Sequence, residues 1–246
     1  MLNFEVIGQG ATTKVYRDGV TAIKLYENAP PDEAENEAER QRFAINAGLS
    51  VPSVFGVRRL DNGNVALDME YINGKPFIYH GMNKNERREA IDTLVELQHS
   101  VHQVNASGLP KQTQRLSQKI NHLSCLNYKD KNCLLTLLSE LDAGKENLCH
   151  GDFHPLNILY DGKKHWIIDW VDATAGNPFA DACRTYLIFK QYMTRSAGIY
   201  LKAFCDKSKA NQDDILAWLP IVAVGRLHEK LDDKARVWLL EQIKFT

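Results

Sequence analysis

Short alternating hydrophobic runs, separated by tight-turn residues, fill the amino-terminal part of the chain and predict an antiparallel sheet. Asp18-Gly19 and Asp61-Asn62-Gly63-Asn64 are typical of hairpin turns, because Gly, Asn and Asp tolerate the backbone angles that such turns need. The strands are expected over residues 4–7, 14–16, 20–26, 54–60 and 65–71.

A helix is expected between the two hairpins, over residues 32–47. It begins at Asp32, a residue type that caps helices, is rich in glutamate early and ends at Gly48. Its buried stripe, at helical spacing, is expected to contain Ala34, Glu37, Ala38, Gln41 and Ile45. A buried carboxylate is costly unless it is paired, so Glu37 should have a cationic partner.

The hydrophobic pattern changes after Tyr71, where Asn73-Gly74-Lys75-Pro76 is typical of a connector. Helical periodicity then predominates, and helices are expected over residues 85–104, 114–126, 131–141, 179–193, 199–205, 213–229 and 232–243. The chain is therefore predicted to be α+β, with a sheet-rich part over residues 1–72 and a larger, mainly helical part over residues 73–246.

Composition narrows the class of protein. Hydrophobic residues make up 44% and charged residues 25% of the 246 positions, which is typical of a folded globular chain. The net charge of -1 gives no general electrostatic reason to expect nucleic acid or an anionic membrane as partner. Neither a signal-peptide pattern nor a bilayer-spanning segment is found, and the 5 cysteines form no C-x-x-C pair. We expect a cytoplasmic protein with a small-molecule partner.

The most specific chemistry lies in the run CHGDFHPLNILYDGKKHWIIDW. Asp152 is followed five residues later by Asn157, and Asp169 ends an apolar, strand-like run that would normally avoid a charge. This order resembles the kinase motif H-R-D-x-x-x-x-N and the later D-F-G, with Gly151 in place of Arg and Trp170 in place of Phe. Asp152 suits a catalytic base for a hydroxyl proton, and Asn157 and Asp169 offer the hard oxygens that Mg²⁺ prefers.

Two features near the amino terminus suit phosphate binding. Gly8 and Gly10 lie in a loop between two predicted strands, and a Walker A loop or dinucleotide fingerprint would need residues or a helix that this chain lacks there. A strand-loop-strand flap over phosphates is expected instead. Lys24, in Ala-Ile-Lys-Leu, resembles the phosphate-holding lysine of the kinase V-A-I-K strand, and Glu37 is its expected partner.

A competing interpretation takes His150, Asp152 and His154 as transition-metal ligands of a hydrolase, because H-x-D-x-H places three donors close together. The remaining members of the 8 histidines are scattered and form no companion cluster. Lys24 and Asn157 would also have no explanation, so phosphoryl transfer is preferred.

The H-G-D-x-x-x-x-N loop, then Ile-Asp-Trp, Gly176-Asn177-Pro178 and Asp181, resemble the aminoglycoside phosphotransferase and choline kinase superfamily. The resemblance covers nearly the whole chain and implies a two-lobed, protein-kinase-like fold. It implies that the backbone from Glu70 to Ile72 holds the purine and that Asp181 braces the catalytic loop. A helix-start carboxylate favoured by the helix dipole is the alternative role for Asp181. The remaining implied roles are Asp152 as base, Lys24 on phosphates, and Asn157 and Asp169 on magnesium.

The expected activity is ATP- and Mg²⁺-dependent transfer of phosphate to a hydroxyl of a small molecule, with GTP not excluded. The alternatives are a nucleotide-binding regulatory pseudokinase and a small protein kinase, although no segment after Asp169 resembles an activation loop. The acceptor stays open. Basic residues slightly outnumber acidic ones after Gly176, which disfavours a polycationic aminoglycoside, and scattered aromatic residues are more often core than a choline cage.

Overall fold

The computed structural model describes residues 5–10, 13–27, 30, 32–78 and 81–243 and divides into two compact units. The first unit consists of Met1–Tyr79 and Pro155–Asp172, and the second of His80–His154 and Ala173–Thr246. The lobes predicted at 1–72 and 73–246 differ from these units mainly at Pro155–Asp172. That segment packs with the first unit because its strands pair with the strand that follows the connector at Gly74.

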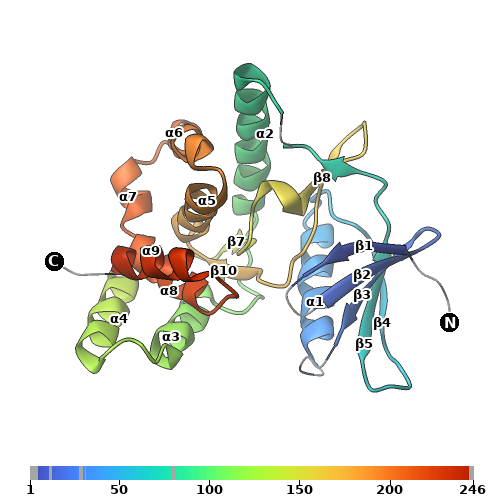
Figure 1. Cartoon of the computed structure of the whole chain (residues 1–246), viewed down its shortest axis with the longest axis horizontal. Helices are drawn as coiled ribbons and strands as arrows, with labels where there is room; N and C mark the ends of the chain where they lie inside the picture. The colour runs from blue at the N-terminus through green and yellow to red at the C-terminus, as the bar shows by residue number, and fades with distance from the viewer. Residues whose placement is uncertain (1–4, 11–12, 28–29, 31, 79–80, 244–246) are drawn as a thin grey trace. The chain divides into compact units, whose positions relative to one another are not determined.

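A five-stranded antiparallel sheet forms the main part of the first unit (Figure 1). Its spatial order is β1-β2-β3-β5-β4, and both predicted hairpins are present. The strands are β1 (Glu5–Gln9), β2 (Thr13–Asp18), β3 (Thr21–Tyr26), β4 (Val54–Arg59) and β5 (Val65–Glu70). Phe4, expected to begin the first strand, lies outside the described residues.

Helix α1 (Glu33–Asn46) packs against β4 and β5. Its buried residues are Ala34, Glu37, Ala38, Gln41 and Ala44, so the predicted stripe is confirmed except that Ala44 replaces Ile45. Asp32 is the N-cap residue, as predicted, but its backbone is already in the right-handed helical region and its side chain makes no cap hydrogen bond. Ala34 and Ala38 meet Tyr26, Val65 and Leu67 in the core of this unit.

A second, three-stranded sheet carries the later motif residues. Strands β6 (Lys75–Pro76), β8 (Ile158–Tyr160) and β9 (His165–Ile167) pair in the antiparallel order β6-β8-β9. The short 3₁₀ helix η1 (Pro155–Asn157) leads into β8. The sheet therefore places Asn157 just before one strand and Asp169 just after another, and the backbone N–H of Ile168 donates to the carbonyl of Asn157 at 3.0 Å.

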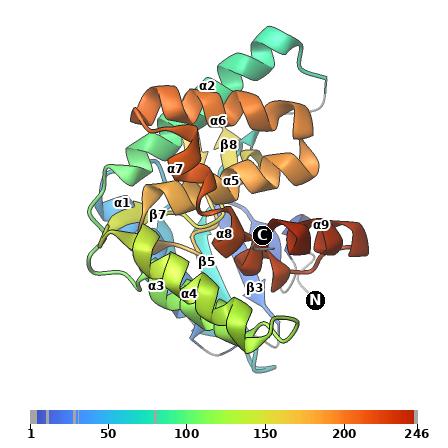
Figure 2. The same ribbon diagram turned by 90° about the vertical axis from the view of Figure 1, so that its left-hand side faces the viewer.

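The second unit is mainly helical (Figure 2). Its helices are α2 (Lys84–His102), α3 (Gln112–His122), α4 (Tyr128–Asp142), α5 (Pro178–Tyr192), α6 (Thr194–Ser208), α7 (Gln212–Leu216), α8 (Leu219–Leu227) and α9 (Asp233–Ile243). A two-stranded sheet joins β7 (Asn147–Cys149) to β10 (Thr174–Gly176). The predicted buried face of α2 is confirmed: Ile91, Leu94, Val95, Gln98 and Val101 are all buried.

One predicted helix, over residues 213–229, is two helices. Helix α7 ends at Leu216 and α8 begins at Leu219, with Pro220 in its first turn. Proline has no backbone N–H and clashes with the preceding turn, so it is accepted where a helix begins and not within one. In the described part of the chain, none of the helices combines the length and hydrophobicity that crossing a membrane requires.

Gly176 of β10 packs closely against Gln112, the first residue of α3. A Cβ atom there would lie 2.4 Å from Cβ of Gln112, whose Oε1 accepts the backbone N–H of Asn177 at 3.0 Å. We expect Gly176→Ala to lower the free energy of unfolding by about 1–3 kcal/mol, the usual cost of overpacking. Urea denaturation measures this, with Gly198→Ala as control because a Cβ there meets nothing within 4 Å. Equal midpoints for the two variants would contradict the expectation.

Candidate active site

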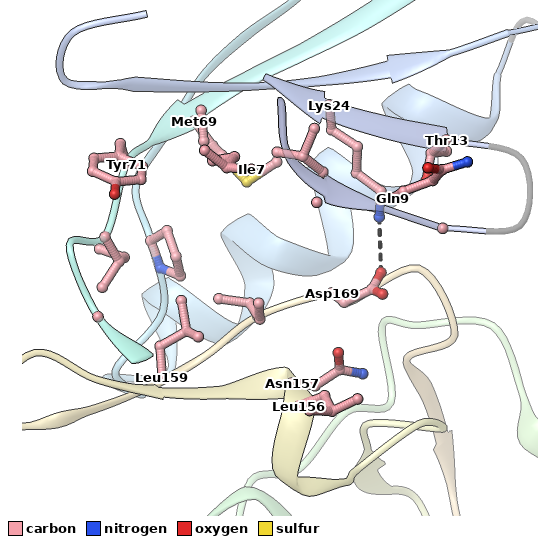
Figure 3. Close-up of a pocket in the computed structure, with 18 of the residues that line it drawn as sticks. Ile7, Gln9, Thr13, Lys24, Met69, Tyr71, Leu156, Asn157, Leu159 and Asp169 are labelled. Carbon is pink, nitrogen blue, oxygen red and sulfur yellow. Dashed lines mark hydrogen bonds and ion pairs between the residues drawn. The ribbon is translucent and has the colours of Figure 1, made fainter. Parts of the chain in front are cut away.

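A pocket of about 750 Å³ lies within the first unit, a volume typical of sites for small ligands (Figure 3). The main sheet, the connector at Gly74, η1 and the segment after β9 all contribute to its lining. All eight residues predicted to bind nucleotide or metal line it: Gly8, Gly10, Lys24, Glu37, Glu70, Ile72, Asn157 and Asp169. Residues far apart in the sequence therefore meet in one cavity.

Lys24 is held by two carboxylates. Its Nζ lies 2.8 Å from each carboxylate oxygen of Glu37 and 2.8 Å from Oδ1 of Asp169. The predicted contact between Lys24 and Glu37 is thus present. Burial alone would lower the pKa of Lys24, but attraction by Glu37 and then Asp169 outweighs it and raises that pKa. The ammonium group therefore stays charged across the physiological pH range.

The positions of Lys24 and Glu37 follow from strand and helix periodicity. Lys24 lies on β3, between Val15 of β2 and Leu67 of β5, and is only 7% exposed. Glu37 lies on the core-facing stripe of α1 and is 1% exposed. The hydroxyl of Tyr26 also donates to Glu37, and burial together with that carboxylate raises the pKa of Tyr26. Each polar group of this buried cluster thereby gains a partner.

Asp169 occupies an unusual backbone conformation. Its φ of 66° lies in the left-handed region, which residues other than glycine rarely adopt. Such backbone conformations are concentrated at functional sites. The next residue, Trp170, anchors the turn: its side chain is fully buried, and its indole N–H donates to the carbonyl of Ile167 at 3.1 Å. The Asp169 side chain is 37% exposed, so its carboxylate borders the pocket while it contacts Lys24.

At the other end of the pocket, β5 leads into the segment from Glu70 to Ile72. The Glu70 carboxylate accepts hydrogen bonds from the backbone N–H and the hydroxyl of Ser53, at 3.1 and 3.0 Å. The Glu70 side chain is therefore committed to the neighbouring loop. The backbone N–H of Glu70 is also committed there, because it donates to the carbonyl of Ser53 at 2.8 Å.

Gly8, expected in a loop, lies within β1 and pairs with Val15 of β2, whereas Gly10 follows directly after the strand; both glycines border the same pocket. The backbone N–H of Gly10 donates to the carbonyl of Thr13 at 2.8 Å, and the pairing of β1 with β2 shifts register between Val6 and Gly8. Ala11 and Thr12, which complete the predicted flap, lie outside the described residues.

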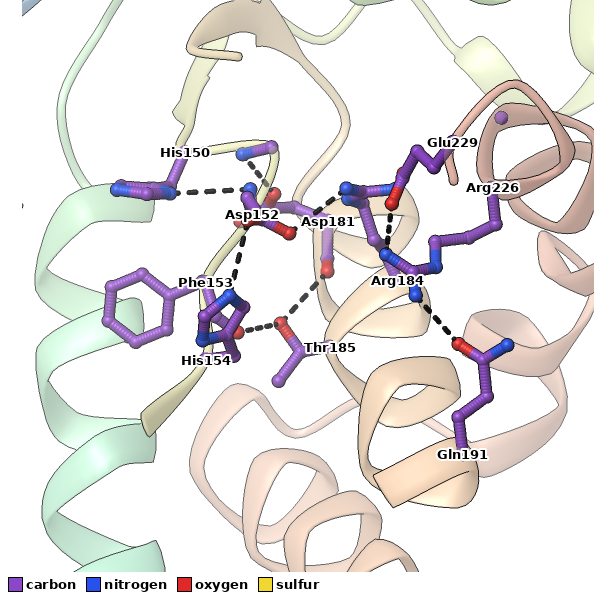
Figure 4. Close-up of polar contacts among 12 residues, drawn as sticks. His150, Asp152, Phe153, His154, Asp181, Arg184, Thr185, Gln191, Arg226 and Glu229 are labelled. Atoms are coloured by element: carbon purple, nitrogen blue, oxygen red, sulfur yellow. Dashed lines mark hydrogen bonds and ion pairs between the residues drawn. The ribbon is translucent and has the colours of Figure 1, made fainter. Parts of the chain in front are cut away.

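Asp152, the predicted catalytic base, belongs to the second unit (Figure 4). Arg184 Nη2 donates to its Oδ1 at 2.9 Å, and His154 Nε2 lies 3.2 Å from its Oδ2. The backbone N–H of Asp152 donates to Nδ1 of His150 at 3.3 Å. Burial would raise the pKa of Asp152, but His154, Arg184 and His150 outweigh burial and lower it far below its usual range. Asp152 is therefore a carboxylate at neutral pH.

The loop that carries Asp152 is braced by Asp181 of α5. Oδ1 of Asp181 accepts the backbone N–H of Gly151 at 2.7 Å, and its Oδ2 lies 2.9 Å from Nε2 of His102 and 3.2 Å from Nε2 of Gln98. Gly151 has a φ of 83°, which glycine adopts without strain. The predicted bracing contact of Asp181 is present, and an interaction with the helix dipole alone would not account for it.

The transition-metal interpretation finds no support in the geometry. Within the described ranges, no three His, Cys, Asp or Glu side chains gather in an arrangement that would hold a metal ion. His150 is fully buried and accepts a hydrogen bond from the loop backbone, as a structural residue does.

The sequence interpretation missed Arg184 as a neighbour of Asp152. Arg184 follows Asp181 by three residues on α5, a spacing that puts both on one helix face, so the signal was present. Glu229, which accepts from Arg184 Nη1 at 2.8 Å, lies beyond α8 and gave no local signal.

Comparison with known proteins identifies the family. The model of the phosphotransferase enzyme family matches residues 3–218. Two solved structures of a thermostable mutant of aminoglycoside phosphotransferase APH(4)-Ia are similar: the apo form (TM-score 0.71) and a variant in complex with ADP and hygromycin B (TM-score 0.72), each with 12% identity and 98% of this chain and 92% of that chain covered. The GDP complex of wild-type aminoglycoside 2'-phosphotransferase-IIIa has a TM-score of 0.64 and 15% identity over the same shares.

At these identities the structural similarity establishes the fold, and it confirms the predicted protein-kinase-like α+β fold. No curated protein sequence matched the chain. The family match covers most of the chain and confirms the resemblance noted from the motifs. The chain therefore belongs to the phosphotransferase enzyme family.

Proposed function

We propose that this enzyme transfers the γ-phosphoryl group of ATP to a hydroxyl group of a small molecule in a Mg²⁺-dependent reaction. The observation that carries the proposal is the pocket of the first unit, where the ion-paired Lys24 and the oxygen donors Asn157 and Asp169 line one cavity. Phosphoryl transfer depends mainly on positioning and on electrostatic stabilisation, and these residue types supply both.

In this proposal Lys24 contacts the phosphates of the nucleotide while Glu37 holds its ammonium group in place. The backbone from Glu70 to Ile72 contacts the purine, and Gly8 and Gly10 let the flap approach the phosphates. Solved neighbours were crystallised with ADP, AMP-PNP or GDP, which supports a purine nucleotide. GTP is therefore tested beside ATP.

The donor set at Asn157 and Asp169 fits magnesium. One carboxylate and one amide oxygen are hard ligands, and Mg²⁺ is usually held by one or two protein groups together with water and substrate phosphates. When bound, the ion would neutralise charge on the phosphates. Asp169 borders the pocket from a turn with a left-handed φ, and the backbone carbonyl of Asn157 accepts from the N–H of the neighbouring Ile168.

Asp152 supplies the proposed base. Because its pKa is held low, its carboxylate is ionised and can accept a hydrogen bond from the acceptor hydroxyl. Such a weak base orients the hydroxyl first and takes its proton only as the new oxygen–phosphorus bond forms. Asp181 keeps the loop in place through Gly151.

The acceptor is proposed to be a small molecule, as in the solved neighbours that were crystallised with hygromycin B or kanamycin. The basic side chain beside Asp152, Arg184, does not favour a polycationic acceptor. The test is a screen of hydroxyl compounds with purified protein, ATP and Mg²⁺, in which the mass of each acceptor is followed. An increase in mass by one phosphoryl group is the expected result.

Magnesium dependence of nucleotide binding gives a second test. ATP should bind the wild-type protein more tightly with Mg²⁺ than without it, and Asp169→Asn should lose most of that difference, about tenfold or more in affinity. Isothermal titration calorimetry measures both. Asp61→Asn, at an exposed turn, is the matched control. Magnesium dependence that persists in Asp169→Asn would contradict the assignment.

A further inference from the structure

A chain of charged groups runs from Asp152 through the second unit (Figure 4). Arg184 of α5 donates through Nη2 to Asp152 and through Nη1 to Glu229, at 2.9 and 2.8 Å. The other carboxylate oxygen of Glu229 accepts from Arg226 of α8, and Arg226 Nη2 donates to Oε1 of Gln191 at 2.9 Å. The guanidinium group of Arg184 thus connects Asp152 to Glu229, and Arg226 holds Glu229 from the other side.

The Arg184 side chain is largely buried, as expected for a residue that holds another side chain in place. Its side chain is 12% exposed and that of Arg226 is 7% exposed, whereas Asp152 and Glu229 are 24% and 31% exposed. Charges removed from water in this way cost free energy unless their partners are well placed. Two guanidinium groups and two carboxylates balance in charge here.

The planar fork of arginine explains why these contacts fix a direction. Its nitrogens point along fixed directions, so one guanidinium can bind two carboxylates only when both lie where the fork requires. Lysine has a single flexible ammonium group and cannot impose this geometry. Both oxygens of Asp152 are thereby located, Oδ1 by Arg184 and Oδ2 by His154.

We propose that Arg184 is a positioning residue, which orients the Asp152 carboxylate for the acceptor hydroxyl and is itself held in register by Glu229. This inference rests on the proposed function, because it assigns Asp152 the role of base. Arg184 also stabilises the ionised form of Asp152, as do His154 and His150 on its own loop. Asp181 carries a second negative charge behind this loop and is engaged by His102, Gln98 and Gly151.

The test compares Arg184→Met, Arg184→Lys and Glu229→Gln in the full-length protein, with Arg195→Met at an exposed position of α6 as control. The titration of the Asp152 carboxyl is followed by carbon NMR, and its signal is assigned by its loss in Asp152→Asn. Phosphate transfer is measured with the best acceptor of the screen and with water alone.

In Arg184→Met, the Asp152 carboxyl should titrate at a clearly higher pH than in the wild type, because burial remains and the main cation is gone. The kcat should fall by about 100-fold, as expected for a misplaced catalytic group, with little change in the KM for ATP. Arg184→Lys should restore most of the titration and little of the kcat. Glu229→Gln should lower kcat while the titration stays close to that of the wild type.

An Arg184→Met protein that folds with unchanged titration and kcat would overturn the inference, and so would full recovery of kcat in Arg184→Lys. If Arg184→Met does not fold, Arg184→Lys and Glu229→Gln decide in the same way. If the wild-type protein transfers phosphate to no acceptor, the proposed function fails and the positioning role fails with it. The titration would then still show whether Arg184 holds Asp152.

Discussion

Replacing Asp152 with asparagine is expected to reduce the rate of phosphate transfer by about 10²–10⁴-fold, the usual contribution of a catalytic base. Asparagine keeps the shape of the side chain but cannot take a proton from the acceptor. The affinity for ATP should change little, because the residues that line the nucleotide pocket belong to the first unit and Asp152 to the second. Transfer rates and calorimetric nucleotide affinities measure the two effects separately.

Asp206→Asn is the control for this variant, because Asp206 is an exposed carboxylate of the same unit that pairs with the surface residue Lys202. It should transfer phosphate at the wild-type rate. Asp152→Asn also removes a negative charge beside Arg184, so thermal unfolding should be recorded for both variants. A folded Asp152→Asn protein with the full rate would show that another group is the base.

The second large effect is expected for Lys24→Met, which should lower both stability and nucleotide affinity. Glu37 is 1% exposed, and without Lys24 its carboxylate would be buried with the hydroxyl of Tyr26 as its remaining partner among the described residues. Breaking such a buried pair costs about 3–5 kcal/mol of folding free energy. Urea denaturation measures this loss, and Lys14→Met, at a more exposed ion pair on β2, should cost at most about 1 kcal/mol.

A double variant separates folding from binding at this pair. Replacing Lys24 and Glu37 together by methionine removes both buried charges, so much of the lost stability should return. Nucleotide affinity should not return, because the phosphates would still have no ammonium group to contact. If the double variant binds ATP as the wild type does, Lys24 serves the fold alone and the proposed phosphate contact is wrong.

The Lys24–Glu37 contact was predictable because each buried charge needs a partner of opposite charge. A glutamate on a core-facing stripe needs a cation, and a lysine inside a central strand needs an anion. Pro220 could have indicated the helix break, but the apolar periodicity on both sides of it favoured one continuous helix. Local pattern alone therefore placed most elements, but it misjudged this junction and made the helix expected over residues 199–205 too short, since α6 spans Thr194–Ser208.

Contacts that arise only from tertiary packing were harder to predict from the sequence. Glu229 reaches Arg184 from beyond α8, 45 residues along the chain, and no periodicity connects them. Likewise the pairing of β6 with β8 brings Pro155–Asp172 into the first unit, although the connector at Gly74 suggested that everything after it belonged together. A two-residue strand such as β6 has too short a pattern to be recognised in advance.

The most direct measurement is the acceptor screen with purified protein, ATP and Mg²⁺, read by the mass of each hydroxyl compound. Antibiotics, amino alcohols, sugars and hydroxy acids should be included, with GTP in parallel. We predict that at least one acceptor gains one phosphoryl group and that equal amounts of ADP or GDP appear. Asp152→Asn should slow this transfer by about 10²–10⁴-fold, and omission of Mg²⁺ should prevent it. Tight nucleotide binding that needs no metal, with no phosphate transferred to any acceptor, would contradict the proposed function.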